Sequence, residues 1–223
     1  MIKIENVNYS IPNGDPVLVD VSFEIKSGDF IGVLGKNGAG KTTLIDLIMG
    51  FRRPTSGKVV VFDKDPSTSD RGMFNQISFL SQDVWLKDNI SVNDFFKFHS
   101  TFYETYSIED QNNLLTKFKV DLKLKIGGLS TGQKRRVQII AAIASRPKIL
   151  LIDEITAVLD PDARKVFFDL LIEINLKHNT AIVLATNIVE DLKDRIKNLI
   201  FIKDHKIEKH EPCNLDKLFH GDE

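Results

Sequence analysis

The chain has 223 residues, 42% of them hydrophobic and 27% charged, which is enough to bury a substantial core. With Lys+Arg at 30 and Asp+Glu at 31 the formal net charge is -1, which excludes a global field that would draw the protein to nucleic acid or to an anionic membrane. The single cysteine, Cys213, excludes an internal disulfide, and stretches without Asp, Glu, Lys or Arg, such as residues 72–82, are far shorter than the roughly 20 apolar residues that span a bilayer.

The N-terminal part of the chain predicts strands that lead into a strand–loop–helix unit. A continuous apolar run at residues 30–34 is typical of a parallel strand buried on both faces, and it ends at Gly35. Residues 41–49, closed by Gly50, have helical spacing. The other strands predicted here, from apolar alternation or from short apolar runs near turn residues, are residues 2–7, 17–25, 58–62 and 76–80.

The middle of the chain changes to helical patterns. Ser91 and Ser107 each stand three residues before an aspartate, which is the spacing of a helix-start capping pair. Residues 83–145 therefore predict a helical subdomain inserted into an α/β core. That core would be formed by residues 1–82 and 146–223.

The core pattern resumes after this insertion. Residues 149–152 and 181–185 predict two buried strands. Between them a helix is expected to begin at Asp160, with Pro161 in its first position. The tail, residues 210–223, has no assigned role.

The string GKNGAGKT at residues 35–42 follows a predicted strand and opens a predicted helix. Its glycines let backbone N–H groups curl around phosphates, and the helix start adds its positive dipole end. Lys41 supplies a point charge to the outer phosphates, and Thr42 would place its hydroxyl on Mg²⁺. The nucleotide-contacting residues predicted in this segment are Gly35, Asn37, Gly38, Ala39, Gly40, Lys41, Thr42 and Thr43.

Two carboxylates, Asp153 and Glu154, end the predicted strand at 149–152, which brings them to the sheet edge beside the phosphates. Asp153 is expected to hold Mg²⁺ through water, and Glu154 to polarise the attacking water as a general base. A strand that ends in two acids is common, so this assignment depends on the phosphate loop that accompanies it.

The string LSTGQ at residues 129–133 predicts a second phosphate-contacting helix start. Ser130 would cap the helix with Gln133 in the reciprocal position, and Gly132 leaves room for a phosphate. Together the three strings resemble the ATP-binding cassette (ABC) ATPases. That resemblance implies a P-loop (RecA-like) ATPase core with an antiparallel β-subdomain and an inserted helical subdomain. It also implies ATP and Mg²⁺ as cofactors, and a homodimer or heterodimer in which LSTGQ contacts the γ-phosphate of ATP on the opposite subunit.

The resemblance assigns three more residues, each with an alternative. Gln82 matches the glutamine that reaches Mg²⁺ and the attacking water, but it could be a solvated loop residue. Tyr9 matches the adenine-stacking aromatic, or it is a plain strand residue. Asp160 matches the aspartate that links the two active sites across the dimer, or it is an N-cap, or both.

The sequence departs from the family at one position that bears on catalysis. Where the family places its switch histidine after the last core strand, this chain has Asn187. The Asn187 amide can still donate a hydrogen bond to the γ-phosphate. The alternative is an N-cap with Glu190 in the reciprocal position.

The function implied by the resemblance is that of the ATP-binding and ATP-hydrolysing subunit of an ABC transporter. An integral membrane permease is expected to dock near Gln82 and Trp85 through apolar anchors in a groove. The small helical subdomain looks closest to those of drug and antibiotic-peptide exporters. The alternatives are a soluble ABC ATPase of assembly, repair or translation, and an ATP-gated regulatory module that hydrolyses poorly.

The start of the sequence, MIKIENVNYS, has neither the basic nor the apolar segment of a secretion signal. We therefore expect a cytoplasmic protein that is peripheral on the cytoplasmic face of the membrane, and no nucleic-acid partner.

Overall fold

The structure, a computed structural model, describes residues 1–12, 14–68, 71–81, 86–193, 196 and 198–210. Its strands are β1 (Ile2–Ser10), β2 (Pro16–Ile25), β3 (Phe30–Gly35), β4 (Ser56–Val61), β5 (Ile77–Leu80), β6 (Ile149–Asp153), β7 (Ala181–Thr186), β8 (Asn198–Lys203) and β9 (Lys206–His210). Its α-helices are α1 (Lys41–Ile48), α2 (Arg71–Phe74), α3 (Val92–Ser100), α4 (Ile108–Phe118), α5 (Thr131–Ala144) and α6 (Pro161–His178). Three 3-10 helices, η1 (Ile126–Gly128), η2 (Ile155–Val158) and η3 (Val189–Asp191), complete the set.

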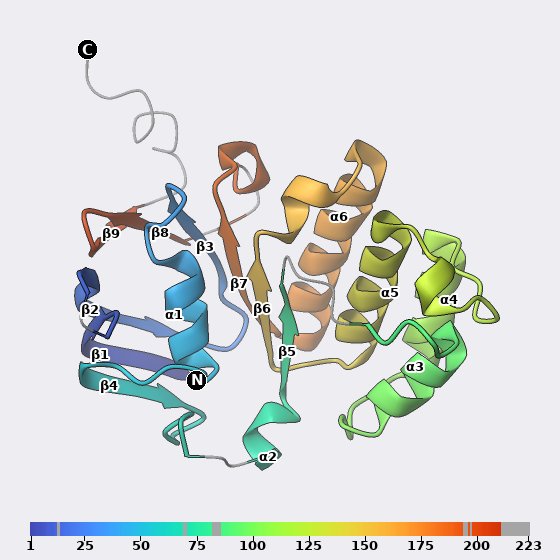
Figure 1. Cartoon of the computed structure of the whole chain (residues 1–223), viewed down its shortest axis with the longest axis horizontal. Coiled ribbons are helices and arrows are strands. Elements are labelled where there is room, and N and C mark those ends of the chain that lie inside the picture. The colour runs from blue at the N-terminus through green and yellow to red at the C-terminus, as the bar shows by residue number, and fades with distance from the viewer. Residues whose placement is uncertain (13, 69–70, 82–85, 194–195, 197, 211–223) are drawn as a thin grey trace.

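The strands form two sheets, with helices packed between and beside them (Figure 1). The smaller sheet is antiparallel and has the order β2-β1-β4. The larger has the order β5-β6-β7-β3-β8-β9, and its strands are parallel except for β9. The parallel core and the antiparallel β-subdomain agree with the predicted α/β fold class.

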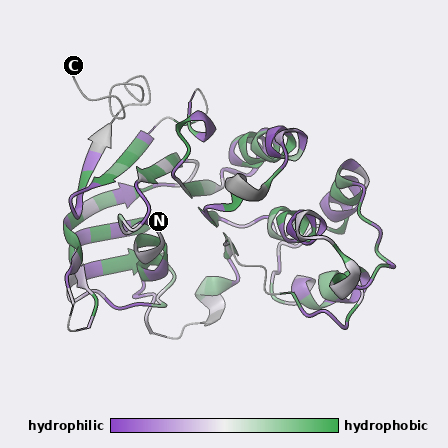
Figure 2. Ribbon diagram, turned by 45° about the horizontal axis from the view of Figure 1, so that its top comes forward, coloured by the Kyte–Doolittle hydropathy of each residue, from purple (hydrophilic) through white to green (hydrophobic). Residues whose placement is uncertain are grey.

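Strand β3 shows how the larger sheet is buried on both faces. Phe30 and Leu34 belong to the core shared with α5 and α6, whereas Ile31 and Val33 belong to the core shared with α1 and the smaller sheet. Burying one such side chain stabilises the fold by about 1.5–3 kcal/mol, which explains why the run carries no polar residue. Along the smaller sheet, by contrast, hydrophobic and hydrophilic residues alternate (Figure 2).

Helix α1 begins where the sequence predicts. Its N-cap is Gly40 at φ 106, and a Cβ there would lie within 3.3 Å of Val17 and Leu18 in β2. This backbone angle and this close approach both require glycine. At the other end Gly50, at φ 70, follows the last turn.

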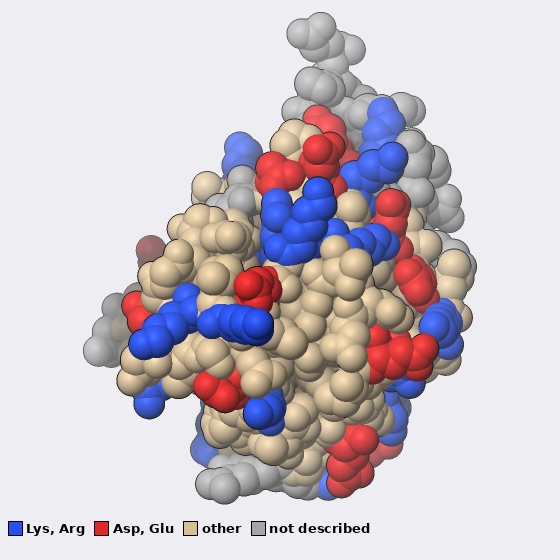
Figure 3. Space-filling view, turned by 90° about the vertical axis from the view of Figure 1, so that its right-hand side faces the viewer, with Lys and Arg blue, Asp and Glu red and all other residues tan. Residues whose placement is uncertain are grey.

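The helical insertion lies between β5 and β6 and contains α3, α4 and α5. Both predicted caps are present, because the Ser91 and Ser107 side chains accept from the backbone N–H groups of Asp94 and Asp110 at 3.0 and 3.1 Å. Basic and acidic side chains of the described residues are interspersed on the face that includes these helices (Figure 3). Within the described residues, no helix combines the length and the hydropathy that a bilayer crossing needs.

Candidate functional site

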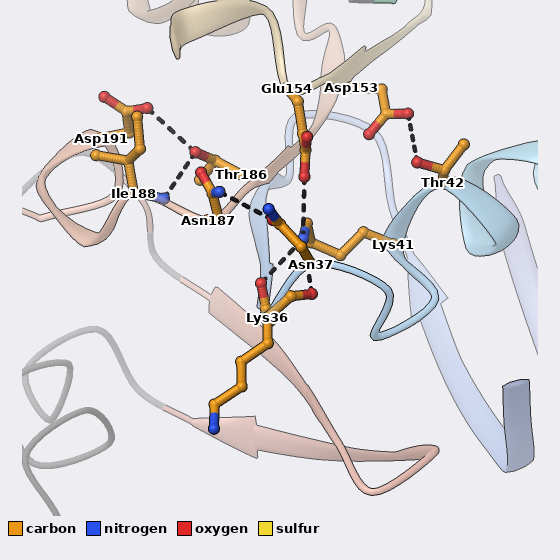
Figure 4. A network of polar contacts seen from close by, with 11 residues as sticks. Lys36, Asn37, Lys41, Thr42, Asp153, Glu154, Thr186, Asn187, Ile188 and Asp191 are labelled. Atoms are coloured by element: carbon orange, nitrogen blue, oxygen red, sulfur yellow. Dashed lines mark hydrogen bonds and ion pairs between the residues drawn. The ribbon is translucent and has the colours of Figure 1, made fainter.

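Lys41 lies at the centre of the site, at the first position of α1, and only 4% of it is exposed. Its Nζ donates to the backbone carbonyls of Gly35 and Lys36, at 2.9 and 3.1 Å. The same ammonium forms an ion pair with Glu154 Oε1 at 3.0 Å (Figure 4). The loop therefore encloses a positive charge that faces the carboxyl ends of the parallel strands.

The loop around Lys41 depends on two left-handed glycines. Gly38 has φ 81 and Gly40 has φ 106, values that residues with a Cβ rarely adopt. A Cβ at Gly38 would meet no heavy atom within 4 Å among the described residues. The requirement at Gly38 is thus conformational, and the space beside it is open to a bound group.

Thr42 and Asp153 form the second part of the site. Thr42 Oγ1 donates to Asp153 Oδ2 at 2.8 Å. The other carboxylate oxygen, Oδ1, is buried and has no hydrogen-bond partner within the described part of the chain. Burial raises the pKa of Asp153 despite the Thr42 hydrogen bond. An orphaned carboxylate oxygen beside a hydroxyl oxygen fits a hard divalent cation such as Mg²⁺.

Glu154 has an unusual backbone. Its φ of 51 places a non-glycine residue in the left-handed region, at a cost of about 1–2 kcal/mol, and its N–H donates to Ala185 O at 3.0 Å. The chain turns sharply there at the end of β6. As a result Glu154 reaches Lys41, while the adjacent Asp153 faces Thr42 (Figure 4).

Asn187 is exposed at the end of β7, and its side chain reaches the phosphate loop. Its Nδ2 donates to Asn37 Oδ1 at 3.0 Å. The following 3-10 helix, η3, has Ile188 as its N-cap, so the interpretation of Asn187 as an N-cap is wrong. The amide instead lies beside the loop that carries Lys41.

The LSTGQ helix start has the predicted capping box. Ser130 Oγ accepts from the N–H of Gln133 at 3.3 Å, and Gln133 Oε1 accepts from the N–H of Ser130 at 2.9 Å. A Cβ at Gly132 would have open space around it, so a group can approach this end of α5 closely. Figure 1 shows α5 across α6 from the phosphate loop, so the fold keeps these two helix starts apart.

Asp160 is the N-cap of α6. Its Oδ1 accepts from Ala163 N at 2.8 Å, and its Oδ2 lies 3.2 Å from Arg136 Nη2 of α5. The hydrogen bond from Ala163 lowers the pKa of Asp160. The capping alternative is confirmed, and a role across a dimer stays a prediction.

Tyr9 does not suit the predicted contact with adenine. It is 7% exposed in the core of the smaller sheet, its hydroxyl accepts from Arg52 at 2.8 Å, and the Arg52 guanidinium lies 5.6 Å from the ring centroid. Val7 and Tyr9 share the inward face of β1, so the period of 2 already indicated burial. The exposed apolar residue just beyond this strand is Ile11, at 54%.

Two predicted site residues, Gln82 and Trp85, lie outside the described residues, as do residues 211–223 of the tail. Thr43 is half-buried on α1. Asp191, which no sequence motif marks, is a buried carboxylate that accepts a hydrogen bond from Thr186, the residue before Asn187.

Comparison with known proteins gives concordant results. A family model described as ABC transporter matches residues 18–157. The chain is 34% identical to the methionine import ATP-binding protein MetN of Cupriavidus metallidurans, over 86% of this chain and 60% of that protein. It is 32% identical to the lipoprotein-releasing system ATP-binding protein LolD of Buchnera aphidicola, over 84% of this chain and 88% of that one. A solved ATP-binding subunit of an ABC transporter superposes with a TM-score of 0.88 at 21% identity, over 98% of this chain and 93% of that one.

Proposed function

The chain belongs to the ABC transporter family of ATP-binding proteins, and from that premise we propose that it is the ATP-hydrolysing subunit of a transporter. In this proposal two such subunits close around ATP and Mg²⁺, and their closure and reopening drive a separate membrane permease. The permease would hold the subunit at the cytoplasmic face of the membrane. The chain spans only 60% of the length of the MetN protein above, so the activity of that whole protein does not transfer directly.

One observation supports this function most strongly: the buried Lys41 ammonium is held between two loop carbonyls and Glu154. A γ-phosphate that binds at the loop competes with the Glu154 carboxylate for this ammonium, because a phosphate oxygen is a charge-assisted acceptor of the same kind. Lys41 would then neutralise the phosphate. Glu154, freed from the ion pair, would accept the proton of the attacking water.

The other residues of the site have orienting roles in this proposal. Thr42 and Asp153 supply the hydroxyl and carboxylate oxygens that would hold Mg²⁺. When bound, Mg²⁺ supplies charge neutralisation for the phosphate oxygens. The left-handed backbone of Glu154 fixes the direction of its carboxylate, and the Asn187 amide stands where it can donate to a phosphate once it leaves Asn37.

A second copy completes the site. The capped, exposed start of α5 presents free N–H groups and a positive dipole end, which favour an anion. Because α5 lies across α6 from Lys41 of its own chain, we propose that Ser130 and Gly132 contact ATP held by the partner. Each ATP is then shared by two subunits.

For the permease contact we propose an exposed aromatic pair on and just after α3, in the insertion that follows the predicted docking residues. Phe98 and Phe102 are 63% and 49% exposed, and their rings meet edge to face at 4.9 Å. Exposed aromatic pairs of this kind suit an amphipathic helix, whose apolar anchors supply most of the binding energy.

This contact can be tested by co-purification from membranes that contain the cognate permease. We expect Phe98→Ser combined with Phe102→Ser to reduce recovery of the chain. Leu176→Ser removes an apolar residue that is 75% exposed on α6 and is the matched control, with expected recovery like that of the wild type. Equal recovery of both variants would contradict the proposed docking site.

The direction of transport stays open. The sequence predicts an exporter, but the relatives do not support this direction, because their names include methionine import as well as lipoprotein release.

Phosphate release from Mg-ATP by the purified chain tests the proposed function. We expect ATP-dependent turnover, and a loss of at least about 100-fold in Glu154→Gln, because a positioned general base contributes that much. No turnover by the wild type, alone or with the permease, would contradict the proposal.

A further inference from the structure

Asp191, on η3, is a buried carboxylate that the proposed chemistry does not use. It is 2% exposed and faces Arg164 of α6, with Oδ1 3.0 Å from Nε and Oδ2 3.3 Å from Nη2. Its Oδ2 also accepts from two hydroxyls, Thr156 of η2 and Thr186 at the end of β7, the latter at 3.2 Å. One carboxylate thus joins η2, α6 and the end of β7.

Two of the joined elements adjoin site residues. Thr186 Oγ1 donates to Asp191 and accepts from Ile188 N at 3.0 Å, so its hydroxyl bridges the residues on either side of Asn187 (Figure 4). Thr156 is two residues beyond Glu154, whose backbone is left-handed. Asp191 therefore fixes the backbone on which Asn187 stands and the turn that follows Glu154.

The chemistry favours a rigid support. A buried carboxylate is strongly destabilising unless it is paired and hydrogen-bonded, and here the guanidinium and two hydroxyls satisfy it. Arg164 Nε meets Asp191 Oδ1 as an ion pair without a hydrogen bond, so the hydrogen bonds of this network come from Nη2 and the two hydroxyls, and such bonds rigidify buried polar surroundings. Removing the carboxylate would take away the acceptor that the hydroxyls of Thr156 and Thr186 share, and would loosen the backbone beside Asn187.

We propose that Asp191 is a positioning residue for ATP hydrolysis, which acts by holding Asn187 in place. This inference rests on the proposed function. It adds a residue that touches neither nucleotide nor metal but sets the orientation of the Asn187 amide.

The test compares Asp191→Asn and Asp191→Ala with Asp110→Asn. Asp110 forms an ion pair with Arg146 at 2.6 Å, between α4 and the end of α5, away from the phosphate loop, so its variant is the matched structural control. We expect the Asp191 variants to lose roughly tenfold in kcat, the equivalent of about 1.4 kcal/mol, with KM for ATP nearly unchanged. The control should keep both constants.

A double-mutant cycle separates positioning from general loosening. If Asp191 acts through Asn187, its substitution should change kcat far less in an Asn187→Ala background than in the wild type. A loss of the same size in both backgrounds would overturn the inference. Thr186→Val, which keeps the side-chain shape, should reproduce the loss, and Thr186→Ser, which keeps the hydroxyl, should restore kcat. These two variants decide the question if the Asp191 variants do not fold.

A readout independent of turnover separates this inference from the proposed function. The side-chain amide signals of Asn187 and Asn37 in an NMR spectrum should shift in Asp191→Asn and stay in place in Asp110→Asn. Shifted signals in a protein without ATPase activity would sink the proposed function but keep the positioning role. Unchanged signals with normal wild-type turnover would overturn the inference alone.

Discussion

At the residue scale, the Lys41 ammonium is surrounded by two carbonyl oxygens and one carboxylate, with almost no exposure to solvent. Charge-assisted contacts of this kind are about twice as strong as neutral ones. The affinity of the loop for phosphate therefore depends on how readily the Lys41 ammonium exchanges its contact with Glu154 for one with a phosphate oxygen.

Replacing Lys41 with Ala should abolish ATP binding while the fold survives. The change removes a charge-assisted phosphate contact that stabilises the complex by roughly 1.5–3 kcal/mol. Thermal unfolding with and without Mg-ATP measures this, and the wild type should be stabilised by ATP while Lys41→Ala is not. Lys36→Ala is the control, because Lys36 is exposed and contributes its backbone carbonyl. Equal ATP stabilisation of wild type and Lys41→Ala would rule out the assignment of residues 35–42 as a phosphate-binding loop.

Asn187 leads to a prediction about rate. A neutral amide is a weaker donor to phosphate than an imidazole that can carry charge, so basal hydrolysis should be slow. Asn187→His should raise kcat by roughly 10 to 100-fold, which corresponds to about 1.5–3 kcal/mol. Asn187→Ala should lower kcat modestly, by roughly tenfold as in the Asp191 variants, because within the described residues the amide reaches the loop through its hydrogen bond to Asn37.

Steady-state phosphate release from the three proteins, alone and with the permease, checks this. If a heterodimer partner supplies a complete second site, Asn187→His should have little effect until that partner is added. A lower rate in Asn187→His than in the wild type would contradict the argument about this position.

The sequence predicts Lys41, Asp153 and Glu154 correctly as neighbours because each stands at the end of a strand or the start of a helix in one parallel sheet. It could not predict Asp191. Its hydroxyl and guanidinium partners lie 5 to 35 positions away in the chain, and nothing local marks such a contact. Tyr9 shows the opposite case, because a local pattern was informative. The alternation along the strand indicated that its side chain is buried, whereas the resemblance assigned it to a contact with adenine.

At the scale of elements, the helix starts are predictable because a cap is a contact over three residues. The β8–β9 hairpin is different. Its turn residues, Asp204 and His205, both have positive φ, at 48 and 66, where Asn-Gly or Asp-Gly is the usual signal. The turn residues therefore carry no sequence signal for this hairpin.

Helix α3 carries a partly buried histidine, His99, that makes stability depend on pH. The His99 ring packs against Phe95 and Tyr103, and its Nε2 lies 3.1 Å from Ser145 Oγ. Burial lowers the pKa of His99 from 6.5 to about 4. Between pH 6.5 and about pH 4, His99 is therefore protonated in the unfolded chain but remains neutral in the folded chain. The stability contribution is fully present above pH 6.5 and is lost as the pH falls towards 4, by about 2–3 kcal/mol.

Denaturant unfolding at pH 7.5 and pH 5 measures this loss. His99→Phe, which suits the aromatic surroundings, should remove most of the difference between the two pH values. Burial also lowers the pKa of His178, but less than that of His99, so His178→Gln should remove only a smaller part of the difference. The same difference in wild type and His99→Phe would contradict the assignment to His99.

At the scale of the whole molecule, the parts needed to enclose a nucleotide lie on separate elements. The phosphate loop and the two strand-end carboxylates share one edge of the larger sheet, while the open start of α5 lies across α6 (Figure 1). In a two-fold dimer the phosphate loop of each chain can face the α5 start of the other chain. The same pair of surfaces then meets twice. We therefore expect ATP to join two such chains.

Sedimentation velocity of the Glu154→Gln protein tests this claim most directly, since the variant holds ATP without turning it over. Without nucleotide it should sediment as a monomer, and with ATP and Mg²⁺ as a two-fold dimer, because binding to the dimer alone shifts the equilibrium. Adding Ser130→Glu, which places a carboxylate against the partner's γ-phosphate, should restore the monomer. A Glu154→Gln protein that binds ATP yet stays monomeric at tens of micromolar would contradict the account.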